Sequence, residues 1–351
     1  MKRRFFAALC VVALMITCMG LSGCGKKEPE TSAPAPTTTV ATTTAAPTEV
    51  PLLQNPYTGE YDMDAEGSTR PVGVMIGNNW TSRPQYGIED ADLYFEAETE
   101  GGITRLMAIY ASAERMPNTV GPCRSARTPF VKTAKMLDLL YIHVGGSTTG
   151  KAKINALGLA HFDGNAGGEV FWRDQGLINS KGYEYSMMAS GSKALKRMKN
   201  EDYRMETNAA PLFTFGEKNG DGAGKTATVE LSYYQTDIFS YDEGTGLYTK
   251  YTLDEAPKTK HVSADGDPIE VKNVLVLYAP KYMENNTTCD FDLSGGDGIL
   301  LTNGTSRDVA FSSDGNAFSF TETDGSPMIV NPGKTYICLV GTYEEGYTTL
   351  A

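Results

Sequence analysis

The chain has 351 residues, with 31 Lys and Arg against 43 Asp and Glu, which gives a formal net charge of −12. This length is enough for two ordinary domains, and 40% hydrophobic against 21% charged residues excludes wholesale disorder. The acidic balance argues against DNA or RNA as a partner, because binding a polyanion requires a dense basic surface. Six cysteines are too few for a scaffold held together by disulfides.

The N-terminus has the pattern of an export signal. Basic residues at positions 2–4 precede an apolar stretch over residues 5–21, and small residues follow it. The stretch is short for a membrane span, and no second apolar segment of about 20 residues follows it. We therefore expect residues 1–23 to be a cleaved signal peptide.

The end of this signal, Leu21-Ser22-Gly23-Cys24, resembles the bacterial lipobox. In such signals the cysteine thiol receives a diacylglyceryl group and becomes the first residue of the mature chain, so Cys24 is the predicted lipidation site. Cleavage would leave 28 basic against 43 acidic residues, a balance that an anionic lipid surface repels. We therefore expect the lipid to hold the protein on the extracytoplasmic face of the cell membrane. The alternative is an ordinary signal in which Cys24 is incidental.

Residues 24–67 are predicted to join this anchor to the folded part as a flexible linker. Thr, Ala and Pro dominate residues 25–50, and this composition cannot bury enough surface to offset the entropy of ordering. At about 3.1 Å per residue, an extended Pro-containing spacer of this length reaches at most roughly 80 Å.

Four short apolar runs bounded by glycine or charge are typical of buried or half-buried strands. They cover residues 71–77, 92–98, 105–111 and 139–145. Because no clear helix separates the first two runs, we expect a mixed sheet in an N-terminal α/β domain of residues 68–205.

A helix is predicted over residues 128–140, between the third and fourth of these strands. Thr128 has the side chain of an N-cap and Pro129 suits the first helical position. Apolar residues then recur on one helical face. Residues 150–158 and 186–199 also have helical patterns.

The sequence then changes to short strands separated by turns. Residues 238–241 and 247–251 flank a glycine-rich turn and predict a hairpin. A strong strand pattern covers residues 271–278. Further strands are predicted at residues 298–302, 309–312, 317–321, 328–331 and 335–340. Together they indicate a β-rich C-terminal domain, 226–351, closed as a barrel or a sandwich. The boundary lies in residues 200–225, and the fold class is α+β.

Polar and glycine-rich blocks lie at the ends of the N-terminal strands or in the loops that leave them. Ligands of open α/β sheets bind at such strand ends. The blocks are residues 78–85, 96–105, 120–127, 143–147 and 171–174.

These blocks resemble the YerB-type bacterial lipoproteins, which carry a two-part domain of unknown function. The resemblance covers most of residues 68–345. It implies the two-part architecture and an envelope location, and it implies no reaction. It is carried by Arg70-Pro71-Val72 with Asn78, Arg83-Pro84-Gln85, Ala91-Asp92 with Glu96, Glu100 to Arg105, Gly121 to Arg127, His143 to Ser147, Phe171-Trp172-Arg173 and Asn331 to Tyr336.

Arg124 and Arg127 lie three residues apart at the start of the predicted helix 128–140. Guanidinium groups and the free N–H groups of a helix N-terminus favour an anion such as a carboxylate, phosphate or sulfate. The alternative is that both arginines pair with nearby glutamates and stabilise the domain. Further ligand-binding residues are predicted at Arg83, Arg105, Arg173 and Ser147.

Glu96 and Glu98 are two apart on a predicted strand and therefore face the same side. Such a pair can act as general acid and base, or bind a cation or a sugar hydroxyl. Salt bridges to Arg105 or Arg124 are the alternative. His143, close to Ser147, could serve a nucleophile, but Ser147 lacks the nucleophile-elbow pattern and no third residue can be assigned.

Other chemical groups give weaker signals. Cys123 could pair with His143, and one disulfide among Cys123, Cys289 and Cys338 is possible. The three histidines show no metal-binding spacing, and no phosphate-binding loop is present, so neither a metal nor a cofactor is predicted. Trp80 and Trp172 could stack on sugar rings or belong to the core.

The leading hypothesis is a non-enzymatic membrane-anchored lipoprotein. It would bind an anionic cell-wall component or an envelope protein partner in an arginine-lined cleft. The alternative is a hydrolase or transferase acting on the cell wall through Glu96, Glu98 or His143. A solute-binding lipoprotein of a transporter is a third possibility, against which the different character of the two halves argues.

Overall fold

A computed structural model describes residues 51–64, 69–208, 211–254, 257–343 and 348–351. The predicted signal peptide, Cys24 and most of the linker lie outside these ranges. Within the ranges, no helix has the length and apolar character needed to span a bilayer.

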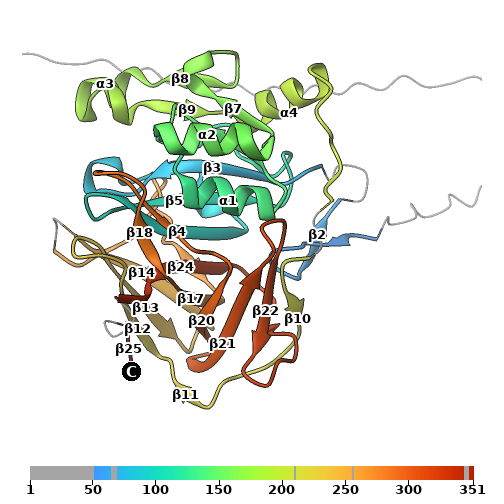
Figure 1. Cartoon of the computed structure of the whole chain (residues 1–351), viewed down its shortest axis with the longest axis vertical. Helices are drawn as coiled ribbons and strands as arrows, with labels where there is room; N and C mark the ends of the chain where they lie inside the picture. Colours follow the sequence, from blue (N-terminus) through green and yellow to red (C-terminus); the bar gives the residue numbers. More distant parts are fainter. Residues whose placement is uncertain (1–50, 65–68, 209–210, 255–256, 344–347) are drawn as a thin grey trace, which may run out of the picture. The chain divides into compact units, whose positions relative to one another are not determined.

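One mixed sheet of eleven strands runs through both predicted domains (Figure 1). The four strands predicted in the N-terminal part are confirmed as β3, β4, β5 and β6. In spatial order the sheet contains β11 (Gly222–Ala223), β21 (Thr305–Ser313), β20 (Gly295–Thr302), β17 (Asn273–Ala279), β24 (Thr335–Gly341), β4 (Leu93–Glu100), β5 (Ile103–Tyr110), β3 (Val72–Gly77), β6 (Leu140–His143) and β7 (His161–Asp163), with β22 (Phe318–Glu322) beside β21.

The two halves of the chain meet at the pairing of β4 with β24. These strands are parallel, and Glu96 lies opposite Cys338 in their register. On its other side β4 pairs antiparallel with β5 through the tight turn at Gly101 and Gly102, both with positive φ. All residues of β3, β17 and β24 are buried, as expected of strands covered on both faces.

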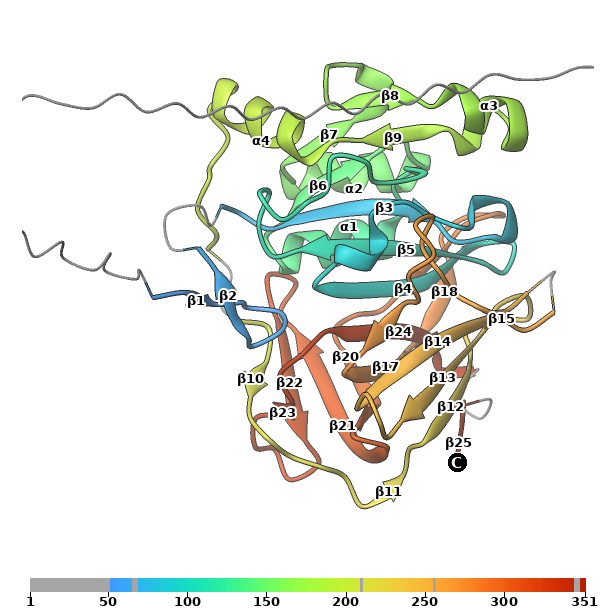
Figure 2. The same cartoon turned by 180° about the vertical axis from the view of Figure 1, so that it is seen from behind.

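Helices α1 (Thr128–Met136) and α2 (Thr148–Leu157) cover one face of the β3–β6 region, as the two opposite views show (Figures 1 and 2). The predicted first turn with Pro129 is confirmed. The helix ends at Met136 rather than at residue 140, because Asp138 adopts a positive φ and Leu140 begins β6. Phe130 of α1 packs edge-on against Phe95 of β4.

The prediction of one helix over residues 186–199 is wrong in its first part. Residues 187–189 form strand β9 (Met187–Ala189), which pairs with β8 (Phe171–Arg173). Helix α4 (Gly191–Asn200) follows, and Ser190 caps it by accepting a hydrogen bond from the Lys193 N–H. The remaining helical elements are α3 (Gln175–Lys181) and the 3₁₀ turns η1 (Trp80–Ser82), η2 (Ile88–Asp90), η3 (Gly164–Ala166) and η4 (Tyr183–Tyr185).

A second sheet of six strands belongs to the β-rich part. The remaining strands form two-stranded pairs, β1 (Leu53–Gln54) with β2 (Tyr61–Met63), β10 (Thr214–Phe215) with β23 (Ile329–Val330), and β18 (Lys281–Met283) with β19 (Cys289–Phe291). The second sheet contains β15 (Thr259–Lys260), β14 (Leu247–Leu253), β13 (Thr236–Asp242), β12 (Thr226–Glu230) and β25 (Thr348–Leu350), with β16 (Glu270–Val271) beside β14.

Both of the larger sheets are open, so the predicted closed barrel is wrong. The cause is the pairing of β24, which takes β4 of the N-terminal part as its neighbour instead of closing the β-rich part on itself. The two sheets pack against each other, with Phe239 of β13 5.2 Å from Tyr336 of β24 between ring centroids. This packing is closer to the predicted sandwich.

Two apolar cores lie on opposite faces of the large sheet. Alternate residues of β3 divide between them, Val72 and Val74 facing one core and Met75 the other. Cys123, Cys289 and Cys338 are buried in these cores as free thiols, so the possible disulfide is not formed.

We predict that the two halves do not fold separately. In fragments 51–210 and 211–351, β4 would expose the edge that pairs with β24, and Glu96 would lose its partner Lys250. Each fragment alone is therefore expected to lack a cooperative thermal transition, and an equimolar mixture to recover one, measured by circular dichroism. Independent cooperative unfolding of both fragments would contradict this, and the domain limits 68–205 and 226–351 stay a prediction until this is measured.

Candidate functional site

Buried charged groups from both halves meet beside β4. Glu96 of β4, Asp237 of β13 and Lys250 of β14 are all fully buried. The Lys250 Nζ lies 2.9 Å from Asp237 Oδ1 and 3.4 Å from Glu96 Oε2. Removing three charged groups from water is costly unless they are paired and hydrogen-bonded. We call these residues the buried triad.

Neutral side chains complete the coordination of Glu96. Its Oε1 accepts hydrogen bonds from Asn78 Nδ2 at 2.7 Å and from Thr104 Oγ1 at 2.6 Å. Its Oε2 accepts one from the Tyr336 hydroxyl of β24. Glu96 is thus an acceptor for groups on three strands and on the loop after β3, and it is closed off from solvent.

Only one of the two carboxyl groups in the buried triad is ionised at neutral pH. Burial, together with the negative charge of Glu96, raises the pKa of Asp237 to about 8. Burial opposes ionisation of Glu96 as well, but Lys250 and the surrounding hydrogen bonds hold its pKa below the usual value. Asp237 is therefore largely protonated at neutral pH, and its carboxyl group can donate that proton in a hydrogen bond to Glu96. The ammonium and one carboxylate then cancel.

A histidine extends the triad toward the surface. Lys250 Nζ donates to His261 Nδ1 at 3.3 Å, so the proton of the imidazole is on Nε2, which donates to Gln85 Oε1 at 2.9 Å. Gln85 in turn donates to the Gly77 carbonyl at the end of β3. Burial, Lys250 and Arg83 lower the pKa of His261 well below its usual value, so the ring is neutral.

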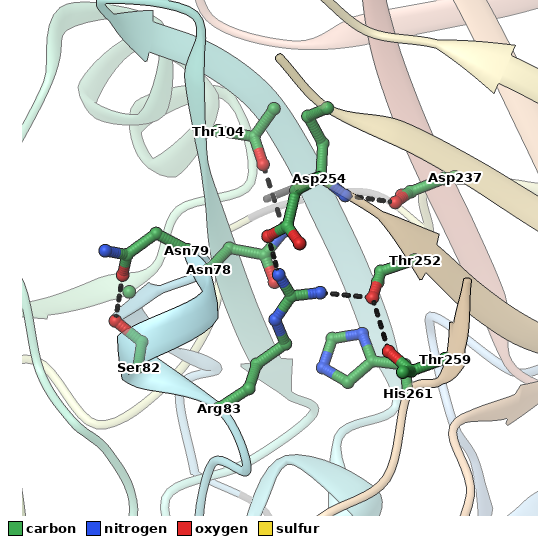
Figure 3. Close-up of polar contacts among 12 residues, drawn as sticks. Asn78, Asn79, Ser82, Arg83, Thr104, Asp237, Thr252, Asp254, Thr259 and His261 are labelled. Carbon is green, nitrogen blue, oxygen red and sulfur yellow. Dashed lines mark hydrogen bonds and ion pairs between the residues drawn. The ribbon is translucent and has the colours of Figure 1, made fainter. Parts of the chain in front are cut away.

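A pocket of about 180 Å³ lies outside His261. Arg83 forms one wall and is fixed by hydrogen bonds to Thr252 and Asp254, with its guanidinium beside the His261 ring in Figure 3. Trp80 stands at the pocket with 51% of its surface exposed. The lining consists of Trp80, Arg83, Pro84, Thr252, Thr259, Lys260, His261 and Val262. We call this the Trp80 pocket.

Three residues of this site were not predicted from the sequence, although a signal was present: Asp237, Lys250 and His261. Alternation in β13 places Asp237 on the same face as Phe239, and alternation in β14 places Lys250 on the same face as Tyr248. A charged residue on the apolar face of a half-buried strand is unusual and indicates a buried partner.

The predicted anion site around Arg124 and Arg127 is largely internally paired. Arg127 binds Glu100 through two hydrogen bonds of 2.6 and 2.5 Å, and Arg105 binds the same carboxylate at 2.6 Å. The pKa of Arg105 is lowered to about 9 by burial and by the positive charges of Arg127 and Arg124. The alternative considered from the sequence, pairing with a nearby glutamate, therefore applies to Arg127. Arg105 pairs with the same residue, Glu100.

Arg124 and Arg173 are held differently. Arg124 donates to the Glu184 carbonyl at 2.8 Å and lies over the Tyr185 ring, with a carboxylate oxygen of Glu184 3.7 Å away. Arg173 donates to the Tyr183 carbonyl and lies 3.5 Å from the Tyr183 ring centroid. Backbone carbonyls and aromatic rings thus orient both guanidinium groups.

The residues of the enzymatic hypothesis do not meet in one site. Glu98 binds Lys281 at 2.8 Å, whereas Glu96 belongs to the buried triad. His143 donates from Nδ1 to the Gly145 carbonyl and accepts at Nε2 from His161, and burial lowers its pKa to about 4.

Two further predicted residues have local roles. Ser147 caps α2 by accepting from the Gly150 N–H. Cys123 is buried, which raises the pKa of its thiol, and its Sγ contacts the Val120 carbonyl rather than His143. Across the ranges that the structure describes, no group of three potential metal ligands is present.

Comparisons with known proteins place these features in a family context. The description "Protein of unknown function (DUF3048) N-terminal domain" matches residues 57–204, and the corresponding C-terminal domain matches residues 227–337. The chain is 30% identical over 308 residues to "Putative lipoprotein YerB" of Bacillus subtilis (strain 168), covering 84% of this chain and 88% of that protein.

A crystal structure of the YerB protein from Bacillus subtilis has the same fold. The TM-score is 0.73 at 26% sequence identity, over 85% of this chain and 99% of that one. The resemblance expected from the sequence blocks is thereby confirmed. Since both domain descriptions give the function as unknown, a functional proposal has to rest on the geometry of the site.

We predict that Lys250→Met lowers the free energy of unfolding by about 3–5 kcal/mol, because it leaves the Glu96 carboxylate buried without its cation. Chemical denaturation at pH 7 measures this change. Lys225→Met is the matched control, since Lys225 is an exposed lysine that pairs with Glu243, and its stability is expected to equal that of the wild type. Equal stability of both variants would contradict the role assigned to the triad.

Asp237→Asn is predicted to change the pH dependence of stability. Folded Asp237 keeps its proton up to about pH 8, whereas the unfolded residue releases it near pH 4. Its contribution to stability is therefore fully present below pH 4 and declines as the pH rises to 8. The asparagine amide can donate to Glu96 at any pH, so the variant gains stability relative to wild type across this window, by at most about 1.4 kcal/mol per pH unit. Parallel stability curves for the two proteins would show that Asp237 is ionised in the fold.

Proposed function

We propose, because this chain belongs to the DUF3048 family, that it is a lipid-anchored protein on the outer face of the cell membrane that binds an anionic polymer of the cell envelope. Support for the anchor comes from the lipobox at Leu21 to Cys24 and from the lipoprotein name of the Bacillus subtilis relative. The linker that follows Cys24 would carry the folded part away from the lipid surface.

The observation that carries the binding proposal is the environment of Arg124 and Arg173. In a chain with 43 acidic residues, both guanidinium groups are oriented by carbonyls and aromatic rings, and within the described residues Arg173 has no carboxylate partner. Within the described residues, the carboxylate that pairs with Arg124 is that of Glu184, which is largely exposed. The charge of these two groups is therefore left for an anion to neutralise.

Aromatic side chains surround these cations and continue toward the Trp80 pocket. Tyr183 has 65% of its surface exposed, and Tyr185 accepts a hydrogen bond at 3.2 Å from Asn79, the residue before Trp80. Rings beside guanidinium groups suit a ligand that combines negative charge with apolar C–H surface, as an anionic wall polymer does. We call Arg124, Arg173, Tyr183 and Tyr185 the cationic surface.

The other functional hypotheses have less support. Glu96, Glu98 and His143 have separate sets of partners, so a common catalytic centre for them is not part of the proposal. A solute-binding protein needs two lobes around a hinge, and the β4–β24 pairing argues against one. An acidic envelope protein would meet the same cationic surface, and its binding is an alternative outcome of the test.

The test measures binding of purified wall teichoic acid, an alditol-phosphate polymer, to the full-length chain in detergent by microscale thermophoresis. Replacing both Arg124 and Arg173 with Ala is expected to weaken binding at least about tenfold, as expected for the loss of charge-assisted hydrogen bonds. Rising salt is expected to weaken the wild-type interaction as well.

A charge-matched control replaces Lys196 and Lys225 with Ala. Both lysines are exposed and pair with Glu169 and Glu243. This variant loses the same total charge but keeps the cationic surface, so its affinity should stay near that of the wild type. If both double variants lost the same affinity, the change in net charge alone would explain the effect. No binding of the wild type to this polymer would contradict the proposal.

A further inference from the structure

We infer that the Trp80 pocket holds a single pyranose ring of a glycan, with its apolar face on the Trp80 indole and an oxygen atom on Arg83 Nε. This inference rests on the proposed function and narrows its ligand to a saccharide. The pocket shares the loop of residues 78–84 with the cationic surface, through the hydrogen bond from Asn79 to Tyr185.

The dimensions of the pocket favour a small ligand group. Its volume of about 180 Å³ is below the roughly 300–1,000 Å³ of sites that enclose drug-sized molecules. One ring of a longer polymer therefore fits, while the rest of the polymer stays outside. His261, which is almost fully buried, closes the inner end.

The indole of Trp80 offers the apolar face that such a ring needs. Trp80 begins the 3₁₀ turn η1, and the turn is fixed by a 2.5 Å hydrogen bond from Ser82 Oγ to Asn79 Oδ1. These contacts fix the backbone of the turn that carries Trp80, while half of the surface of Trp80 remains open to solvent. An aromatic side chain with two rotatable bonds on a fixed backbone loses little entropy on binding.

Arg83, which lines the pocket, carries an unused hydrogen-bond donor. Its side chain is about nine-tenths buried, and its terminal nitrogens are committed to Thr252 and Asp254. The Nε–H is buried and has no partner among the described residues. An unsatisfied buried donor is unfavourable, so an acceptor oxygen of a ligand that reaches this nitrogen would be bound strongly there.

The remaining lining suits the polar edge of a sugar. Thr259 contributes a hydroxyl group that can both donate and accept, and Lys260 is exposed and contributes an ammonium, whereas the Thr252 hydroxyl is already engaged by Arg83. An aromatic face, a fixed donor and a hydroxyl group match the alternation of C–H faces and oxygen atoms on a pyranose. Because Asp254 balances the charge of Arg83, the ring itself need not be charged.

The experiment uses the two tryptophans of the chain as reporters. The Trp172→Phe variant keeps Trp80 as its single tryptophan, and the Trp80→Phe variant keeps Trp172. The full-length variants in detergent are titrated with the uncharged tetramer of N-acetylglucosamine. Emission from Trp80 is expected to shift to the blue and saturate, whereas emission from Trp172 stays unchanged.

Affinity is measured separately by calorimetry. Trp80→Ala is expected to weaken tetramer binding at least about tenfold, as expected for the loss of an aromatic anchor. Tyr61→Ala, which removes another exposed aromatic ring in β2, serves as the matched control and should bind like the wild type. Because Trp80 is half exposed, the thermal midpoint of Trp80→Ala should stay near that of the wild type.

The outcomes separate this inference from the proposed function. Binding of teichoic acid without binding of the tetramer would overturn the saccharide pocket and leave the cationic surface standing. The tetramer could instead bind while Trp80 emission stays unchanged and Trp80→Ala keeps the wild-type affinity. That result would place the saccharide elsewhere and overturn the inference as well. Failure of both ligands would overturn both proposals.

Discussion

The fold depends on a single charge, the ammonium of Lys250, placed where water cannot reach it. Glu96, which belongs to the other half of the chain, pairs with that charge. Asp237 also contacts Lys250 but keeps its proton, so the net charge of the buried triad is zero. A partly assembled triad would leave an ion buried without a partner, which is among the most unfavourable arrangements in a protein. We therefore expect the N-terminal and C-terminal parts to fold and unfold together.

The position of the triad also decides where a ligand could meet both parts. His261, which accepts a hydrogen bond from Lys250 of the triad, forms the inner wall of the Trp80 pocket, while Arg83 reaches across from the loop after β3 to Thr252 of β14. Groups that hold the two family domains together are thus the same groups that shape the pocket. A substitution in the triad changes the pocket as well as the stability, so the two effects have to be measured separately.

Much of the N-terminal half could be predicted from the sequence because its signals are local. Apolar runs gave β3 to β6, and Pro129 marked the first turn of α1. The pairing of β4 with β24 could not be predicted, because it joins residues about 240 positions apart and leaves no periodic pattern. Prediction of the site was limited in the same way. Glu96 was named as a candidate functional residue, but its partners were not, because only the folded sheet brings Lys250 and Asp237 beside it.

The three thiols in the cores have a consequence for where this chain can mature. Cys123, Cys289 and Cys338 are buried as single cysteines, and burial raises the pKa of each above its ordinary value, so very little reactive thiolate forms. The folded part needs no oxidant and no disulfide isomerase to reach its native state. Once folded, its three buried thiols are protected from oxidation, so the native state has the same covalent structure in a reducing and in an oxidising compartment.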